Sequence, residues 1–70
     1  GQPHARHAHT AVRALPEPLR VPLLLKYMEG YSEKEIAHTL HAPVSTVKSR
    51  LYRARRALQK TLSDEEVSFE

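Results

Sequence analysis

The 70-residue sequence contains no cysteine and only two glycines. The lack of cysteine excludes disulfides and thiolate metal sites and fits a reducing compartment, so we expect a cytoplasmic protein. No apolar run approaches the roughly 20 residues of a membrane span, and no secretory signal opens the chain. The sequence has no glycine-rich phosphate loop, and a domain this small leaves no room for a deep pocket. We therefore expect a soluble protein that is not an enzyme and needs no cofactor.

Acidic residues are missing from one segment in particular. Between Ser45 and Lys60 the chain carries six basic side chains and no acid. The formal net charge of the whole chain is +3, but residues 44–62 alone carry +6 and residues 63–70 carry −4. Such a concentration of positive charge in one segment indicates binding to nucleic acid.

Residues 44–62 also have the pattern of an amphipathic helix. One face of this helix is apolar and contains Val44, Val47, Leu51, Ala54, Leu58 and Leu62. The opposite face contains Ser45, Ser49, Tyr52, Arg53, Arg56 and Lys60, flanked by Lys48 and Arg55 on one side and Arg50 on the other. Small residues allow close approach to base edges, and long cations reach the DNA backbone. The pattern predicts a DNA-reading helix; the alternative is a basic face that is only solvated.

The preceding segment predicts a short capped helix. Gly30 suits the left-handed position that closes an earlier helix. Ser32 and Glu35 have the spacing of a capping box, in which each side chain accepts the other residue's backbone N–H. The helix must stop before Pro43, because proline disfavours a helical residue ahead of it. A short helix, a tight turn and a longer basic helix make a helix-turn-helix with the second helix as the reader.

The first part of the chain adds two further helices to the prediction. Thr10 caps a short helix through residue 14, and Pro16 starts a second helix that runs to about residue 28 and that Pro22 should bend. We expect the apolar residues of this second helix to face the helix-turn-helix pair; they are Leu19, Leu23, Tyr27 and Met28. The fold class is therefore all-α, a small four-helix domain over residues 10–62. Residues 1–9 are expected to be a flexible linker. Residues 63–70 are expected to be an acidic tail that is solvated and disordered or forms one more turn capped by Ser63; the alternative is that it folds back on the basic helix and competes with DNA.

Four stretches of the sequence closely resemble region 4 of bacterial sigma factors, and most closely that of the extracytoplasmic-function group of the sigma-70 family. These are residues 15–20, 27–32, 35–37 and 43–55. They contain, in order, the leucine-proline opening, the glycine before the capped helix and the threonine-valine-lysine-serine-arginine core of that family. Region 4 there binds the −35 promoter element in the major groove and docks on the flap of the RNA polymerase β subunit. The resemblance implies the same partners and a role in directing transcription initiation.

The expected DNA contacts fall into two groups. The resemblance implies base contacts by Lys48, Ser49, Tyr52 and Arg53. Phosphate contacts are expected near the start of the reading helix from Ser45 and Thr46, where unpaired backbone N–H groups and the helix dipole assist. Further phosphate contacts, or contacts to the flap, are expected from Arg50, Arg55, Arg56 and Lys60, although Arg50 has an alternative partner in the carboxylate of Glu35. His38, on the first helix of the pair, is expected to touch a phosphate.

The sequence has more apolar surface than one small core requires. The excess residues are Val12, Leu15, Leu24 and Leu25, and the resemblance assigns such a surface to the polymerase flap. The alternative is that they are ordinary core residues. Histidines lie at metal-like spacings, at positions 4, 7 and 9 and at positions 38 and 41, but no cysteine or carboxylate completes either set, so we expect no metal.

Two other functions remain open at this point. The effector domain of a response regulator also has a glycine, a capped helix and a threonine-valine-lysine reader, but it usually lacks the arginine-rich continuation of residues 53–56. The second alternative is an interaction module that binds an inhibitory protein, and anti-sigma factors do bind this family's domains. The default oligomeric state is a monomer, because no heptad seam is left over after the core is formed.

Overall fold

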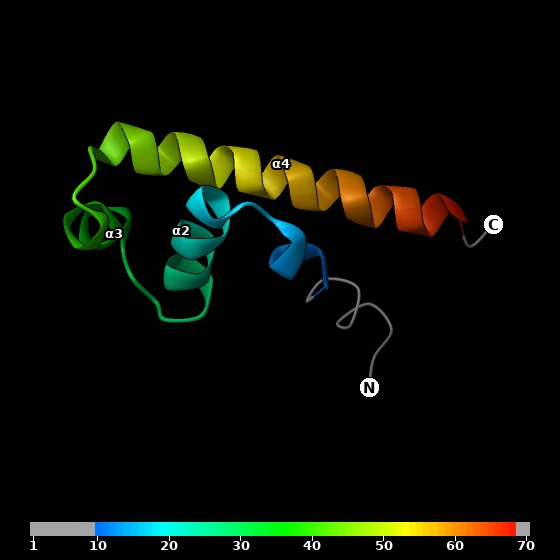
Figure 1. The fold of residues 1–70 in the computed structure, drawn as a ribbon, viewed down its shortest axis with the longest axis horizontal. Coiled ribbons are helices and arrows are strands. Elements are labelled where there is room, and N and C mark those ends of the chain that lie inside the picture. Colours follow the sequence, from blue (N-terminus) through cyan, green and yellow to red (C-terminus); the bar gives the residue numbers. More distant parts are fainter. Residues whose placement is uncertain (1–9, 69–70) are drawn as a thin grey trace.

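The computed structural model describes residues 10–68, and the side chains of residues 10–61. All regular structure in this part of the chain is helical (Figure 1). A short helical segment covers residues 10–14 and is followed by α2 (Glu17–Tyr27), α3 (Glu33–Leu40) and α4 (Val44–Ser68). The structure thus confirms the predicted all-α fold with four helical segments. None of the helices described is both long enough and apolar enough to cross a membrane. The predicted linker, residues 1–9, lies outside the described residues.

Helix α2 is rich in proline yet continuous. Pro16 is its N-cap, and Pro18 lies in the first turn, where the missing N–H has no intrahelical acceptor to lose. Pro22 lies inside the helix, which runs through it without a break. The carbonyl that Pro22 leaves without a helical partner belongs to Pro18, an exposed residue, so water can satisfy it. The Pro22 ring itself is fully buried and forms part of the core.

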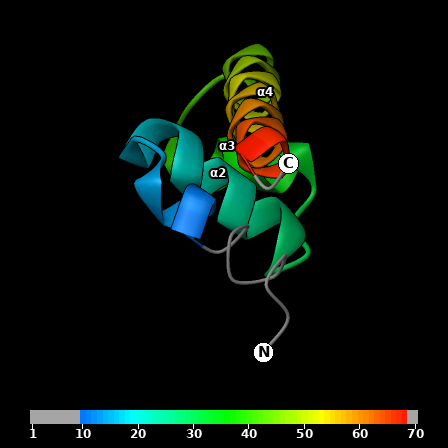
Figure 2. The ribbon, with the colours of Figure 1, turned by 90° about the vertical axis from the view of Figure 1, so that its right-hand side faces the viewer.

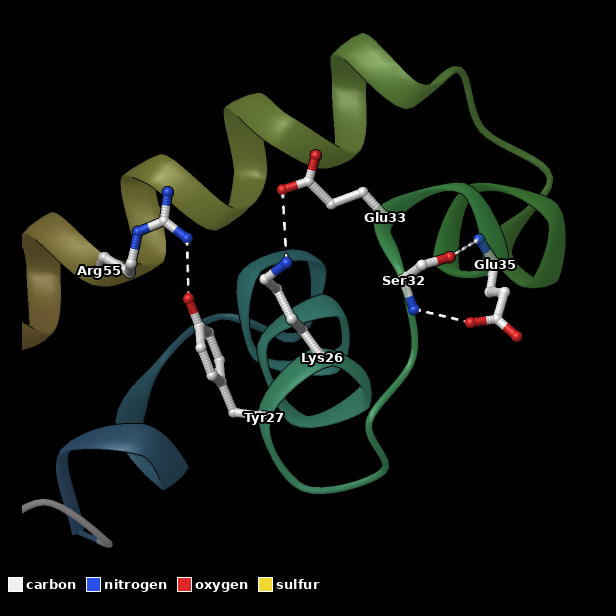
Figure 3. Close-up of polar contacts among 6 residues, drawn as sticks. All are labelled: Lys26, Tyr27, Ser32, Glu33, Glu35 and Arg55. Atoms are coloured by element: carbon white, nitrogen blue, oxygen red, sulfur yellow. Dashed lines mark hydrogen bonds and ion pairs between the residues drawn. The ribbon is translucent and has the colours of Figure 1, made fainter.

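Helix α3 begins with the predicted capping box (Figure 3). The backbone N–H of Glu35 donates to the Ser32 hydroxyl at 3.1 Å, and the backbone N–H of Ser32 donates to the Glu35 carboxylate at 2.8 Å. The backbone N–H of Ser32 lowers the pKa of the Glu35 carboxyl group, and the Ser32 side chain beside it lowers this pKa further. A surface ion pair between Lys26 and Glu33, at 3.5 Å, joins the end of α2 to the start of α3.

The end of α3 is closed by a residue in the left-handed region. His41 has φ 54° and ψ 45°, and its N–H donates to the carbonyl of His38 at 3.3 Å. The N–H of Ala42 donates to the carbonyl of Ala37 at 3.0 Å. This pair of bonds is a Schellman motif in which histidine replaces the usual glycine. Gly30, after α2, is also left-handed, with φ 77°.

The core lies where α4 packs across α2 and α3. The inner side of α4 contributes Val47, Leu51 and Ala54, which have no exposed surface at all. They pack with Ile36 of α3, also fully buried, and with Leu23 of α2. Complete burial of a valine, leucine or isoleucine side chain contributes about 1.5–3 kcal/mol, so these few residues supply much of the stability of so small a domain.

Helix α4 is longer than the sequence analysis suggested. It continues through Ser68, whereas the expected reading helix covered residues 44–62 with at most one further turn capped by Ser63. The chain has no glycine or proline after Pro43, so nothing in the backbone chemistry of residues 63–68 stops the helix. The acidic segment is therefore largely a helical extension of the reading helix, and Figure 1 shows it leading away from α2 and α3.

Removing the Ser32 cap should destabilise the domain. We expect Ser32→Ala to lower the free energy of unfolding by about 1 kcal/mol, because the N–H of Glu35 loses its acceptor. Chemical denaturation followed by circular dichroism measures the change. Thr39→Ala, an exposed substitution within α3, is the matched control and should cause no loss. Equal destabilisation by both variants would contradict a specific role for the cap.

The capping box also predicts a pH dependence. The pKa of Glu35 is lowered by folding, so its contribution to stability is present above its ordinary pKa of 4.5 and is lost as pH falls through the lowered value. Glu35→Gln keeps an acceptor oxygen but cannot titrate. We expect the difference in unfolding free energy between wild type and Glu35→Gln to shrink as pH falls from about 7 to about 3. Glu29→Gln, an exposed substitution outside the box, should show no such trend.

Candidate nucleic-acid interface and partner groove

One side of α4 is free of the other helices and carries the predicted base contacts. Figures 1 and 2 show α2 and α3 on the same side of α4, with the opposite side open. Lys48, Ser49, Tyr52 and Arg53 are all exposed there, and we call these four residues the reading face. By helix geometry Ser49, Tyr52 and Arg53 lie on the side opposite the buried residues Val47, Leu51 and Ala54, and Lys48 lies on the adjoining flank.

The start of α4 adds polar groups next to the reading face. The carbonyl of Pro43 accepts the N–H groups of Thr46 at 3.0 Å and Val47 at 3.2 Å, so the helix begins directly after the proline. The N–H groups of Val44 and Ser45 precede any intrahelical acceptor. The Ser45 side chain is exposed and that of Thr46 is half-buried. This end of the helix offers N–H groups, hydroxyls and the positive end of the helix dipole to an anion.

Further along α4, an arginine is stacked on the reading face. The guanidinium carbon of Arg56 lies 6.0 Å from the centre of the Tyr52 ring, within cation–π range. Tyr52 is 58% exposed, so this contact, rather than burial, restrains its ring. Lys60 is exposed one turn later. Arg56 and Lys60 thus extend the positive charge of the reading face toward the end of the helix.

Two other arginines of α4 lie away from the reading face. Arg50 is half-buried and lines a cleft between the start of α2 and the end of α3, with Glu17, Pro18 and Leu40. The expected alternative pair of Arg50 with Glu35 is not formed, since that carboxylate accepts from the backbone of Ser32. Arg55 is exposed, and its Nη1 donates to the hydroxyl of Tyr27 on α2 at 3.0 Å (Figure 3).

Helix α3 contributes one predicted phosphate contact. His38 is exposed on the outer side of α3, in a shallow depression shared with Tyr31, Lys34, Glu35 and Thr39. It belongs to the first helix of the helix-turn-helix pair, which crosses the DNA backbone in such motifs. The position of His38 is therefore suited to the predicted contact with a DNA phosphate.

An apolar groove lies between residues 10–14 and α2. It has a volume of about 310 Å³. The residues that line it are Val12, Arg13, Arg20, Leu23, Leu24, Tyr27 and Met28. The guanidinium of Arg20 also donates to the carbonyls of Arg13 and Leu15, each at 3.5 Å, which ties α2 to the end of the short helical segment. The groove is a preformed apolar surface with two cations among its lining residues.

Only some of the four residues predicted to contact a partner line the groove. Val12 and Leu24 line it. Leu15 does not line it; this residue is only 7% exposed and belongs to the core. Leu25 is half-buried and packs against the core. For Leu15, therefore, the alternative of an ordinary core residue is correct.

Sequence reasoning also misplaced two residues of α2. Tyr27 and Met28 were expected to face the helix-turn-helix pair, but they are 57% and 75% exposed, and Tyr27 reaches α4 only with its hydroxyl, which accepts from Arg55. They lie where α2 ends, and they line the groove instead. The signal was present in the sequence: Leu24, Tyr27 and Met28 have the i, i+3, i+4 spacing of a second apolar stripe. Pro22 and Leu23 provide the buried residues of α2, and Leu23 also lines the groove.

The arrangement described above has a counterpart among known proteins. The family model of sigma-70, region 4, matches residues 6–58. The chain belongs to the sigma-70 region 4 family. This match favours a sigma factor domain over the effector domain of a response regulator. It also agrees with the helix-turn-helix formed by α3 and α4.

Individual relatives of this region 4 domain support the assignment. The chain is 46% identical over 54 residues to the RNA polymerase sigma-H factor of Pseudomonas aeruginosa, which covers 77% of the chain and 28% of that protein. It is 45% identical over 47 residues to the ECF RNA polymerase sigma-E factors of Salmonella typhimurium and Escherichia coli, covering 67% of the chain and 25% of each relative. The chain therefore spans about a quarter of the length of the curated relatives it matches.

The region 4 domain shows no grouping of metal ligands in the part described. No set of three or more histidine, aspartate or glutamate side chains in that part of the chain is placed to hold an ion. His38 and His41 are both exposed and lie on either side of the end of α3. The histidines at positions 4, 7 and 9 fall outside the described residues.

Proposed function

We propose that this domain recognises the −35 promoter element through the reading face of α4 and docks on the β flap of RNA polymerase through the apolar groove. In this way it would help to direct transcription initiation. The observation that carries the proposal is the reading face: four adjacent side chains able to contact DNA, exposed on a helix whose opposite side is fully buried. Membership of the sigma-70 region 4 family supports the identity of both partners.

Each residue of the reading face has a distinct chemical role in this proposal. Lys48 and Arg53 present donors to guanine O6 and N7, and Arg53 can do so with two parallel hydrogen bonds. Tyr52 offers an apolar ring edge to a thymine methyl group, held in place by the guanidinium of Arg56. Ser49 is small enough to let the helix approach the base edges and can bond to a base itself.

Phosphate contacts frame the reading face at both ends. Ser45, Thr46 and the free N–H groups at the start of α4 bind one phosphate, and His38 of α3 binds another nearby on the backbone. Arg56 and Lys60 bind phosphates farther along α4. Because these contacts carry no sequence information, they fix the register of the helix in the major groove while the reading face selects the bases.

The groove has the chemistry that flap docking requires. Val12, Leu24 and Met28 offer apolar surface, and Arg13 and Arg20 line the same groove. An amphipathic helix with apolar side chains on one face and carboxylates beside them fits such a surface. None of the four reading-face residues lines the groove, so a partner bound there leaves the reading face uncovered.

The DNA part of the proposal predicts different effects for two arginines of α4. Arg53→Ala should weaken binding to the cognate duplex by about 1–3 kcal/mol and relax the choice at one base pair. Arg56→Ala should weaken all sequences similarly and reduce the slope of log affinity against log salt by about one. Fluorescence titrations on promoter and scrambled duplexes, over a series of salt concentrations, measure both effects. Equal losses on the two duplexes for both variants would contradict the division between base and phosphate contacts.

The docking part predicts a loss of polymerase binding when a charge enters the groove. Leu24→Glu places a carboxylate in the apolar lining, and we expect it to weaken binding to polymerase core at least about tenfold, because the charge must be desolvated on docking. Thr39→Glu, which adds the same charge on the outer side of α3, is the matched control and should retain binding. Pull-down with core enzyme in the absence of DNA measures both. Unchanged binding by Leu24→Glu would exclude the groove as the docking site.

A further inference from the structure

Two neighbouring arginines of α4 contact tyrosines that lie in different directions from the helix. Arg56 lies over the ring of Tyr52, on the reading face. Arg55 donates to the hydroxyl of Tyr27, on α2, at 3.0 Å. Consecutive residues of a helix point about 100° apart, so the two guanidinium groups leave α4 in different directions. Figure 3 shows the Tyr27 side chain reaching from α2 to meet Arg55 of α4.

Tyr27 is also part of the groove. Its ring lines the groove with Leu24 and Met28. More than half of the Tyr27 side chain is exposed, so packing alone does not fix the ring. Lys26 lies 6.0 Å from the ring centre, and the Arg55 guanidinium binds the hydroxyl at the far end. The hydrogen bond from Arg55 therefore restrains the tyrosine that forms one wall of the groove.

We propose that Arg55, although it lies on the DNA-reading helix, serves the partner groove rather than DNA, and that its hydrogen bond to Tyr27 positions the groove wall for the polymerase partner. This inference rests on the proposed function, because it takes the groove to be the docking site. It assigns Arg55 a positioning role and leaves Arg56 as the phosphate contact of this part of α4.

The inference makes Arg55 and Arg56 a matched pair for DNA binding. Using the 70-residue chain, Arg56→Ala should reduce the salt slope of duplex affinity by about one, whereas Arg55→Ala and Tyr27→Phe should leave the slope unchanged. Fluorescence titration of a promoter duplex over a series of salt concentrations measures the slope. A reduction of about one with Arg55→Ala would show that Arg55 binds a phosphate and would overturn the inference.

Binding to polymerase core tests the positioning role. Arg55→Ala and Tyr27→Phe should each weaken core binding by about 3- to 10-fold, the net effect of losing one typical protein hydrogen bond. The double variant should be no weaker than either single variant, because both substitutions remove the same bond. Losses that multiply in the double variant, or no loss in either single variant, would overturn the inference. Thermal unfolding of each variant checks that the domain remains folded.

Two further measurements separate this inference from the proposed function. If Leu24→Glu abolishes core binding while Arg55→Ala and Tyr27→Phe retain it, the docking site stands and the inference is wrong. If Leu24→Glu has no effect, the docking proposal fails, and the inference fails with it.

The hydrogen bond between Arg55 and Tyr27 is measured separately by nuclear magnetic resonance. The guanidinium protons of Arg55 should exchange with water slowly in wild type and rapidly in Tyr27→Phe. Equal exchange rates would show that the bond does not restrain Tyr27 in solution.

Discussion

The rest of the structure depends on the burial of three apolar residues on the inner side of α4, which we call the inner row. Val47, Leu51 and Ala54 are completely enclosed between α2 and α3. A helix has a fixed angular spacing of side chains, so placing these three inward forces Lys48 and Tyr52 outward. The reading face therefore needs no positioning device of its own. Its orientation relative to the domain is stabilised by the same apolar contacts that stabilise the fold, and any rotation of α4 would expose the inner row and cost several kcal/mol.

The connection between α3 and α4 sets the second constraint. α3 has only eight residues, too few to be stable in isolation. The hydrogen bonds at its two ends therefore supply a larger share of its stability than they would in a long helix. The capping box at Ser32 satisfies donors at one end, and the left-handed His41 satisfies acceptors at the other. Pro43 then prevents α3 from continuing and starts α4 at the next residue. Local hydrogen bonds thus fix where both helices begin and end, and Ile36 fixes how they pack.

The parts of the fold that depend on local chemistry were predictable from the sequence. Gly30, the Ser32 capping box and the inward row of α4 each rest on interactions within a few residues or on a single helical stripe. α2 was harder because it has two apolar stripes, and only its packing partners decide which one is buried. For that reason Tyr27 was expected to face the helix-turn-helix pair, whereas its ring lines the groove. Leu15, which precedes α2, was a candidate for either the partner surface or the core, and it belongs to the core. A hydrogen bond such as that from Arg55 to Tyr27 spans 28 residues and leaves no periodic signal.

The density of positive charge on α4 gives the distribution of its arginines a physical reason. Like charges three or four residues apart on a helix repel each other, and no acid lies between Ser45 and Lys60 to compensate. The structure spreads these cations over three directions: Arg56 over an aromatic ring, Arg55 on a hydroxyl of α2, and Arg50 in a cleft between α2 and α3. Each contact is individually weak, but together they separate the charges and leave a smaller set facing outward.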